Sequence, residues 1–124
     1  MSLPPDRLLI IDDDPMQLEL VQRGLARDGF DVRGVTTVAE LAIVAAEFAP
    51  AIVLIDVNLP DASGARAIEV AREAAPGAHV VLYSAWEESR LRVLAADLGA
   101  DGYLSKSESV VAIGRRLREL QRGW

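Results

Sequence analysis

Short apolar segments alternate with longer segments of helical periodicity five times along this chain. The expected strands lie near residues 7–12, 31–35, 51–56, 79–84 and 101–105. The expected helices lie near residues 15–28, 37–48, 64–75, 87–98 and 108–122. Strict strand–helix alternation predicts an α/β fold, in which right-handed crossovers join the strands of one parallel sheet. The third strand is apolar at every position up to its last, which suits a doubly wound sheet covered by helices on both faces.

Residues at the ends of the expected helices support these boundaries. Asp14, followed by proline, suits the start of the first helix, because the proline lacks an N–H that would otherwise need a partner there. Thr37 and Glu40 have the spacing of a capping box for the second helix. Gly99 suits the end of the fourth helix, and Ser107 is expected to cap the fifth.

Length and composition indicate one acidic domain. The chain has 124 residues, of which 51% are hydrophobic, so we expect a leader over residues 1–6 that is flexible and a folded domain over 7–122. A net charge of −6 argues against direct nucleic-acid binding by this domain. The absence of cysteine excludes disulfides and thiolate metal sites. With no signal peptide and no apolar run of roughly 20 residues, we expect a cytoplasmic protein that does not bind membranes.

Polar residues follow four of the expected strands. The apolar runs 8–11 and 52–55 each end directly in aspartate, at Asp12 and Asp56. The run 80–83 ends in Ser84, and the fifth strand leads to the only lysine of the chain, Lys106. Because the carboxyl ends of parallel strands meet at one edge, these side chains are expected to lie close together.

This combination of groups suits a divalent cation and a phosphoryl group. Three neighbouring carboxylates, those of Asp12, Asp13 and Asp56, repel one another unless a cation is bound. Mg²⁺ is the expected ion, with Mn²⁺ as an alternative, because hard cations prefer oxygen ligands. Taken singly, each acid could be a solvated turn residue, Ser84 a strand-end hydroxyl and Lys106 a surface lysine. Their joint occurrence at four strand ends favours a site.

Four segments resemble, in order and spacing, the receiver domain of response regulators, the chemotaxis-regulator-like (CheY-like) family of two-component signal transduction. They are residues 9–15, 55–64, 82–85 and 99–106. The resemblance implies a flavodoxin-like fold with strand order 2-1-3-4-5. It also implies a phosphoprotein that catalyses only its own phosphorylation and dephosphorylation and is not a turnover enzyme.

The resemblance further implies how phosphate and metal are bound. Asp56 would take a phosphoryl group from a sensor histidine kinase or a histidine phosphotransfer protein. Asp13, Asp56 and the backbone carbonyl of Asn58 would bind Mg²⁺ directly, and Asp12 would act largely through water. Possible further partners are an output domain or a second copy of the chain.

Other residues are expected to respond to the phosphoryl group. Ser84 would hydrogen-bond it, and Lys106 would neutralise its oxygens. Tyr103 resembles the aromatic switch that turns inward when Ser84 moves, which changes the surface of the fourth helix, fifth strand and fifth helix. Asn58 and Trp86 occupy positions that tune dephosphorylation. Trp86 either shields the phosphate from water or is simply a loop aromatic that packs on the surface or against a partner.

The sequence departs from the family at Ser107, where a proline after a cis peptide is typical. Two other functions stay open. One is a small aspartate-nucleophile phosphatase of the haloacid-dehalogenase type, and the other is a receiver-like interaction domain that is never phosphorylated. Among the remaining polar residues, His79 is expected only to begin a strand. Four arginines of the last helix are expected to form a solvated face: Arg115, Arg116, Arg118 and Arg122.

Overall fold

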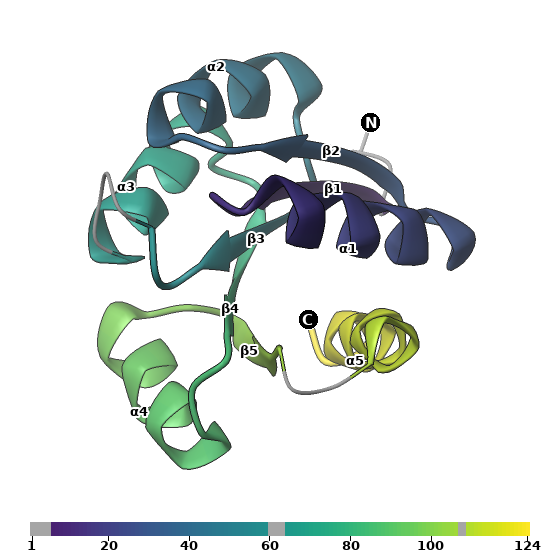
Figure 1. Cartoon of the computed structure of the whole chain (residues 1–124). Coiled ribbons are helices and arrows are strands. Elements are labelled where there is room, and N and C mark those ends of the chain that lie inside the picture. Colours follow the sequence, from purple (N-terminus) through teal and green to yellow (C-terminus); the bar gives the residue numbers. More distant parts are fainter. Residues whose placement is uncertain (1–5, 60–63, 107–108) are drawn as a thin grey trace.

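The computed structural model describes residues 6–59, 64–106 and 109–124, in which five strands alternate with five helices (Figure 1). The strands are β1 (Arg7–Ile11), β2 (Asp31–Val35), β3 (Ile52–Asp56), β4 (His79–Ser84) and β5 (Gly102–Ser105). The helices are α1 (Pro15–Arg27), α2 (Val38–Phe48), α3 (Gly64–Ala74), α4 (Glu88–Leu98) and α5 (Val110–Arg122). Each predicted element is therefore confirmed, and no boundary differs from its prediction by more than two residues.

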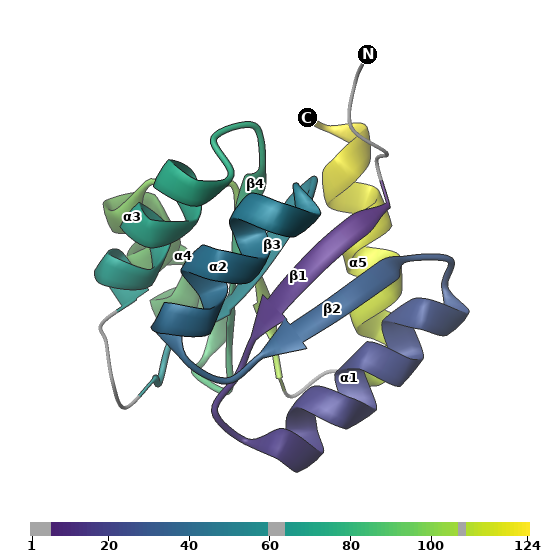
Figure 2. The same cartoon turned by 90° about the horizontal axis from the view of Figure 1, so that it is seen from above.

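The strands form one parallel sheet in the order β2-β1-β3-β4-β5. Helices α1 and α5 cover one face of this sheet, and α2, α3 and α4 cover the other (Figures 1 and 2). Each face has its own buried apolar cluster, which explains why β3 is buried along its whole length. The predicted doubly wound, flavodoxin-like topology is confirmed. None of the helices in the described ranges is long and apolar enough to cross a membrane.

Capping residues set the helix ends that position the strand-end loops. The Asp14 carboxylate accepts hydrogen bonds from the first turn of α1, and Thr37 Oγ1 accepts one from the Glu40 N–H at 3.2 Å. Gly99 ends α4 with φ of 69°, a left-handed conformation that glycine adopts without strain. The capping roles predicted for Asp14, Thr37 and Gly99 are confirmed, whereas the Glu40 side chain accepts from the Thr36 and Thr37 hydroxyls, at 3.0 and 3.3 Å.

The predicted cap of the last helix is wrong. Ser109 caps α5, and its Oγ accepts a hydrogen bond from the Ala112 N–H at 3.2 Å. Two serines two residues apart offer the same capping chemistry. The one that is used lets Ile113 and Leu117 face the core. Ser107 and the peptide bond before it lie outside the described residues.

Arg118 does not belong to a solvated face, contrary to prediction. Its guanidinium donates to the Asp28 carbonyl oxygen at 2.8 Å, lies 3.9 Å from the ring centroid of Phe30, and pairs with Asp6. Asp6 is also held through its carbonyl oxygen, which accepts a hydrogen bond from Asp31 N at 2.8 Å. The residues before Asp6, which make up the rest of the predicted leader, lie outside the described part of the chain.

Candidate functional site

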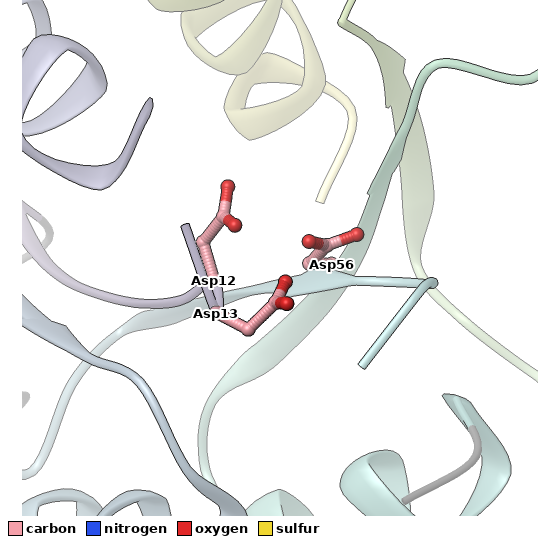
Figure 3. Close-up of side chains that lie close together, drawn as sticks. All are labelled: Asp12, Asp13 and Asp56. Carbon is pink, nitrogen blue, oxygen red and sulfur yellow. The ribbon is translucent and has the colours of Figure 1, made fainter. Parts of the chain in front are cut away.

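Carboxylates from two separate strands meet at the carboxyl edge of the sheet. Asp12 and Asp13 follow β1, and Asp56 is the last residue of the neighbouring strand β3 (Figure 3). One oxygen from each of the three side chains lies within 4.8 Å of the other two. Asp12 and Asp56 are buried, whereas Asp13 is exposed. The group could hold a metal ion, and its oxygen donors with one open side suit a hard divalent cation that keeps water ligands.

Lys106 reaches the same carboxylates from the end of β5, two strands away from Asp56. Its Nζ lies 3.1 Å from Asp56 Oδ2 and 3.3 Å from Asp12 Oδ2. Burial alone would lower the pKa of Lys106, but hydrogen bonds and charge attraction from Asp56 and Asp12 outweigh it and raise the pKa. The lysine is therefore charged at neutral pH and balances part of the buried negative charge.

Asp12, the buried acid that follows β1, remains electrostatically unfavourable in its ionised form. Burial raises the pKa of the Asp12 carboxyl. The hydrogen bond from the Asp14 N–H, at 3.0 Å, and the charge of Lys106 oppose this shift without cancelling it, and the charge of Asp56 adds to it. A bound cation would relieve this cost, so the electrostatics of the site as well as its donor atoms fit a metal.

Short hydrogen bonds fix the loops that leave the strands. Asp56 Oδ1 accepts from Asn58 N at 3.0 Å, and the buried Ser84 Oγ accepts from Trp86 N at 3.1 Å. The Lys106 N–H donates to the Ser84 carbonyl oxygen at 2.7 Å and so joins the ends of β4 and β5. The predicted hydroxyl thus ends the strand next to that of Asp56, and the predicted lysine follows the strand beyond it.

Tyr103 and Trp86 lie on the α4 side of β5. The Tyr103 hydroxyl donates to Glu88 Oε1 at 3.4 Å and accepts from Arg92 Nε at 3.3 Å. Together with Trp86 it lines a pocket of about 300 Å³ between α4 and α5. The centroid of the Trp86 ring lies 3.8 Å from the guanidinium carbon of Arg90, so the ring packs against α4. The shielding role predicted for Trp86 stays a prediction.

Two further residues adjoin the site and were not singled out from the sequence. Tyr83 is fully buried, its hydroxyl accepts a hydrogen bond from Gln17 Nε2 at 3.0 Å, and its ring centroid lies 4.9 Å from Lys106 Nζ. Strand alternation gave a usable signal, because Tyr83 lies directly beside Asp56 in the parallel register. The partner on α1 had no comparable signal.

Known proteins resemble the chain over nearly its whole length. The probable transcriptional regulatory protein TcrX of Mycobacterium tuberculosis is 30% identical over 118 residues, which are 95% of this chain and 50% of that protein. A CheY-like response regulator receiver domain protein of Methanospirillum hungatei is 25% identical, with a TM-score of 0.81 and 96% of each chain covered. A response regulator of Burkholderia pseudomallei, solved with a phosphorylated aspartic acid, calcium ion and citrate, is 28% identical. Its TM-score is 0.75, and the match covers 87% of this chain and 64% of that one.

The family profile of the response regulator receiver domain matches residues 8–118. The chain spans about half the length of curated relatives such as TcrX. Together with the confirmed strand order and the acidic cluster, this match shows that the chain belongs to the response regulator receiver domain family of two-component signalling.

Proposed function

We propose that this domain is a signalling switch controlled by phosphorylation of Asp56. The phosphoryl group comes from the phosphohistidine of a sensor histidine kinase or a histidine phosphotransfer protein, in a reaction that depends on Mg²⁺. The observation that carries the proposal is the convergence of Asp12, Asp13 and Asp56 with Lys106 at one edge of the sheet.

The transfer step needs positioning and charge neutralisation more than covalent help. One carboxylate oxygen of Asp56 forms the new bond to phosphorus while the phosphorus–nitrogen bond of the donor breaks, and the departing imidazole keeps that electron pair. Asp13, Asp56 and the backbone carbonyl of Asn58 would hold the metal, with Asp12 acting through water. Bound Mg²⁺ supplies positive charge at the phosphoryl oxygens.

Lys106 supplies the other positive charge. Its ammonium already lies 3.1 Å from an oxygen of Asp56, so it would contact the phosphoryl group once that group is attached. The Burkholderia pseudomallei relative carries a phosphorylated aspartic acid and a calcium ion. Calcium and magnesium both prefer oxygen ligands, so that pairing of groups supports the proposal.

The response to phosphate would pass through β4 and β5. Ser84 gives up its hydrogen bond to the Trp86 N–H and turns its hydroxyl toward the phosphoryl oxygens. Tyr103 then leaves Glu88 and Arg92 and turns inward, which alters the α4–β5–α5 surface. Asn58 and Trp86 would tune how fast water removes the phosphoryl group.

The partners follow from this role. A histidine kinase or phosphotransfer protein supplies the phosphoryl group in the cytoplasm, and an output domain or a second copy reads the altered surface. The domain catalyses only its own phosphorylation and dephosphorylation. A phosphatase acting on small phosphomonoesters and a receiver-like domain that is never phosphorylated are the alternatives that the following experiment must separate from it.

The direct test is incubation with acetyl phosphate followed by intact-mass measurement. Wild-type protein with Mg²⁺ should gain one phosphoryl group, and protein with excess chelator should not. Asp56→Asn should abolish the gain. Asp101→Ala, an acid removed from the opposite edge of the sheet, is the matched control and should be modified like the wild type.

Three results would contradict the proposal. Modification of Asp56→Asn to the wild-type extent would place the phosphoryl group elsewhere. Steady turnover of p-nitrophenyl phosphate would favour the phosphatase. An unmodified wild-type protein that also fails to bind Mg²⁺ would favour the interaction domain.

A further inference from the structure

We propose that Tyr83 and Gln17 are positioning residues that hold the ammonium group of Lys106 against Asp56. This inference rests on the proposed function, because it assigns the two residues a part in phosphoryl transfer. It is carried by the contact of Lys106 with the Tyr83 ring, by the shared face of these residues at the carboxyl edge, and by a hydrogen bond that ties Tyr83 to Gln17 on α1.

The shared face follows from strand alternation. Residues two positions earlier on the same four strands all belong to the buried cluster under α1 and α5: Ile10, Leu54, Val81 and Leu104. Since side chains alternate between faces, Asp12, Asp56, Tyr83 and Lys106 lie on this same face at the carboxyl edge. Tyr83 lies opposite Asp56 on one side and opposite Leu104 on the other, and Lys106 follows Leu104 by two positions. The lysine therefore leaves the strand next to that of Tyr83, just beyond the tyrosine.

The position of Lys106 makes this intervening side chain important. Lys106 follows β5, whereas Asp56 ends β3, and β4 lies between them. Strands are about 4.8 Å apart, so the lysine must reach across about 10 Å of sheet. Its route passes over the Tyr83 ring, whose centroid lies 4.9 Å from Nζ. This is within the range at which an aromatic face attracts a cation.

Gln17 fixes the ring from the other side. Its Nε2 donates to the Tyr83 hydroxyl at 3.0 Å, and its backbone N–H contacts the Asp14 cap at 3.4 Å. The first turn of α1, which begins two residues after Asp13, is thereby joined to the Tyr83 ring that Lys106 contacts. A buried tyrosine hydroxyl needs a hydrogen-bond partner wherever it lies, so the Gln17 contact alone assigns no role. The contact of the same ring with Lys106 Nζ is what connects Gln17 to the position of the lysine.

The single lysine of the chain makes the proposal measurable. Protein labelled with ¹³C and ¹⁵N lysine gives side-chain signals from Lys106 alone, and methylene protons near the face of an aromatic ring are displaced by its ring current. Tyr83→Leu should remove this displacement and lower the rate of phosphorylation by acetyl phosphate about fivefold. Tyr83→Phe keeps the ring and should retain most of the displacement.

Two further variants make the test specific. Gln17→Leu leaves the core intact and should move the Lys106 signals in the same direction as Tyr83→Leu, but less, with a rate about twofold lower. If Tyr83→Leu does not fold, Gln17→Leu alone tests the inference. Phe30→Leu removes another aromatic ring from the same buried cluster, beneath Arg118, and should leave both the Lys106 signals and the rate unchanged.

Wild-type Lys106 signals in both Tyr83→Leu and Gln17→Leu would overturn the inference, as would equal effects of Phe30→Leu. If the Lys106 signals change in Tyr83→Leu while the rate of phosphorylation does not, the inference would also be overturned, because Tyr83 would then have no part in the reaction. If the wild type accepts no phosphoryl group at all, the proposed function fails. The lysine signals would still show whether Tyr83 holds the ammonium.

Discussion

The two edges of the sheet handle charge in opposite ways. At the carboxyl edge, Asp12 and Asp56 are buried and share Lys106, and burial raises the pKa of Asp12. At the amino edge, Asp101 is partly exposed and lies 3.8 Å from both Arg72 and His79. One edge concentrates negative charge away from water, and the other distributes charge among solvated partners.

The amino edge is built around Asp101. Its Oδ2 accepts the Val80 N–H at 2.7 Å, and its carbonyl oxygen accepts a hydrogen bond from Trp124 Nε1 at 3.4 Å. The Trp124 ring stacks on His79 with 4.0 Å between ring centroids. His79 therefore does more than begin a strand, since it also receives the aromatic side chain at the end of the chain.

The polar groups at the amino edge stabilise the fold, whereas those at the carboxyl edge suit the proposed chemistry. The amino-edge contacts satisfy hydrogen bonds and should contribute modestly to folding. The carboxyl-edge acids are costly to bury, and a bound cation would offset this cost. Substitutions at the two edges should therefore differ in their response to Mg²⁺.

Replacing Lys106 should have the largest effect on stability. Lys106→Met leaves Asp12 and Asp56 buried without their cation, so the free energy of unfolding should fall by about 3 kcal/mol in chelator. Mg²⁺ should restore a large part of this loss. Urea unfolding with and without Mg²⁺ measures both, and Arg72→Met at the amino edge is the control. A loss that Mg²⁺ leaves untouched would contradict the account.

The Asp12 carboxyl should change stability with pH in the opposite sense to a stabilising carboxylate. Because burial raises the pKa of Asp12, its ionised form is less favourable in the folded than in the unfolded chain. Without Mg²⁺, the stability of the wild type relative to Asp12→Asn should fall as pH rises above 3.8, until pH exceeds the folded pKa. Unfolding curves of both proteins across this pH range check the sign. A wild type whose stability rises with pH relative to that of Asp12→Asn would refute the prediction.

Removing Asp101 should destabilise the fold without affecting the site. Asp101→Ala deprives the Val80 N–H of its acceptor, at a cost of about 1 kcal/mol. Because the change is at the amino edge, the Mg²⁺ affinity and the extent of phosphorylation should equal those of the wild type. Unfolding and Mg²⁺ titration of the same preparation test both parts, and a weaker Mg²⁺ affinity would break the distinction between the edges.

Removing Trp124 should have the smallest effect. Trp124→Ala loses a stacked ring on the surface, worth about 0.5 kcal/mol. His79→Ala should cost a similar amount, and the double variant should cost less than the sum, because both single changes remove the same contact. Thermal unfolding of the three variants measures this coupling. Strict additivity would show that the stacking contributes nothing.

The parts of the fold that depend on local pattern were predictable. Apolar runs predicted the strands, and the polar residues at their ends predicted that Asp12, Asp56 and Lys106 lie together. A parallel sheet brings the ends of its strands to one edge whatever the details of packing. The choice of Ser109 over Ser107 as a cap was not predictable, because both serines offer the same local chemistry.

Contacts between distant segments could not be predicted from periodicity. Gln17 and Tyr83 are 66 positions apart, and their hydrogen bond depends on how α1 lies across the sheet. Likewise, the sequence does not distinguish Arg118 from the other arginines of α5. Only the packing of α5 against α1 brings it to Asp28 and Phe30. Such pairs arise from tertiary geometry, which a single sequence does not encode locally.

Isothermal titration calorimetry of the metal-free protein with Mg²⁺ tests the central claim most directly. We predict one saturable site in the wild type, with affinity about tenfold lower in Asp13→Asn and unchanged in Asp101→Ala. The exposed Asp13 is the informative position, because its replacement leaves the buried pair intact. Wild-type protein that takes up no Mg²⁺, or binds it equally well without the Asp13 carboxylate, would contradict the assignment of this edge as a metal-dependent phosphoacceptor site.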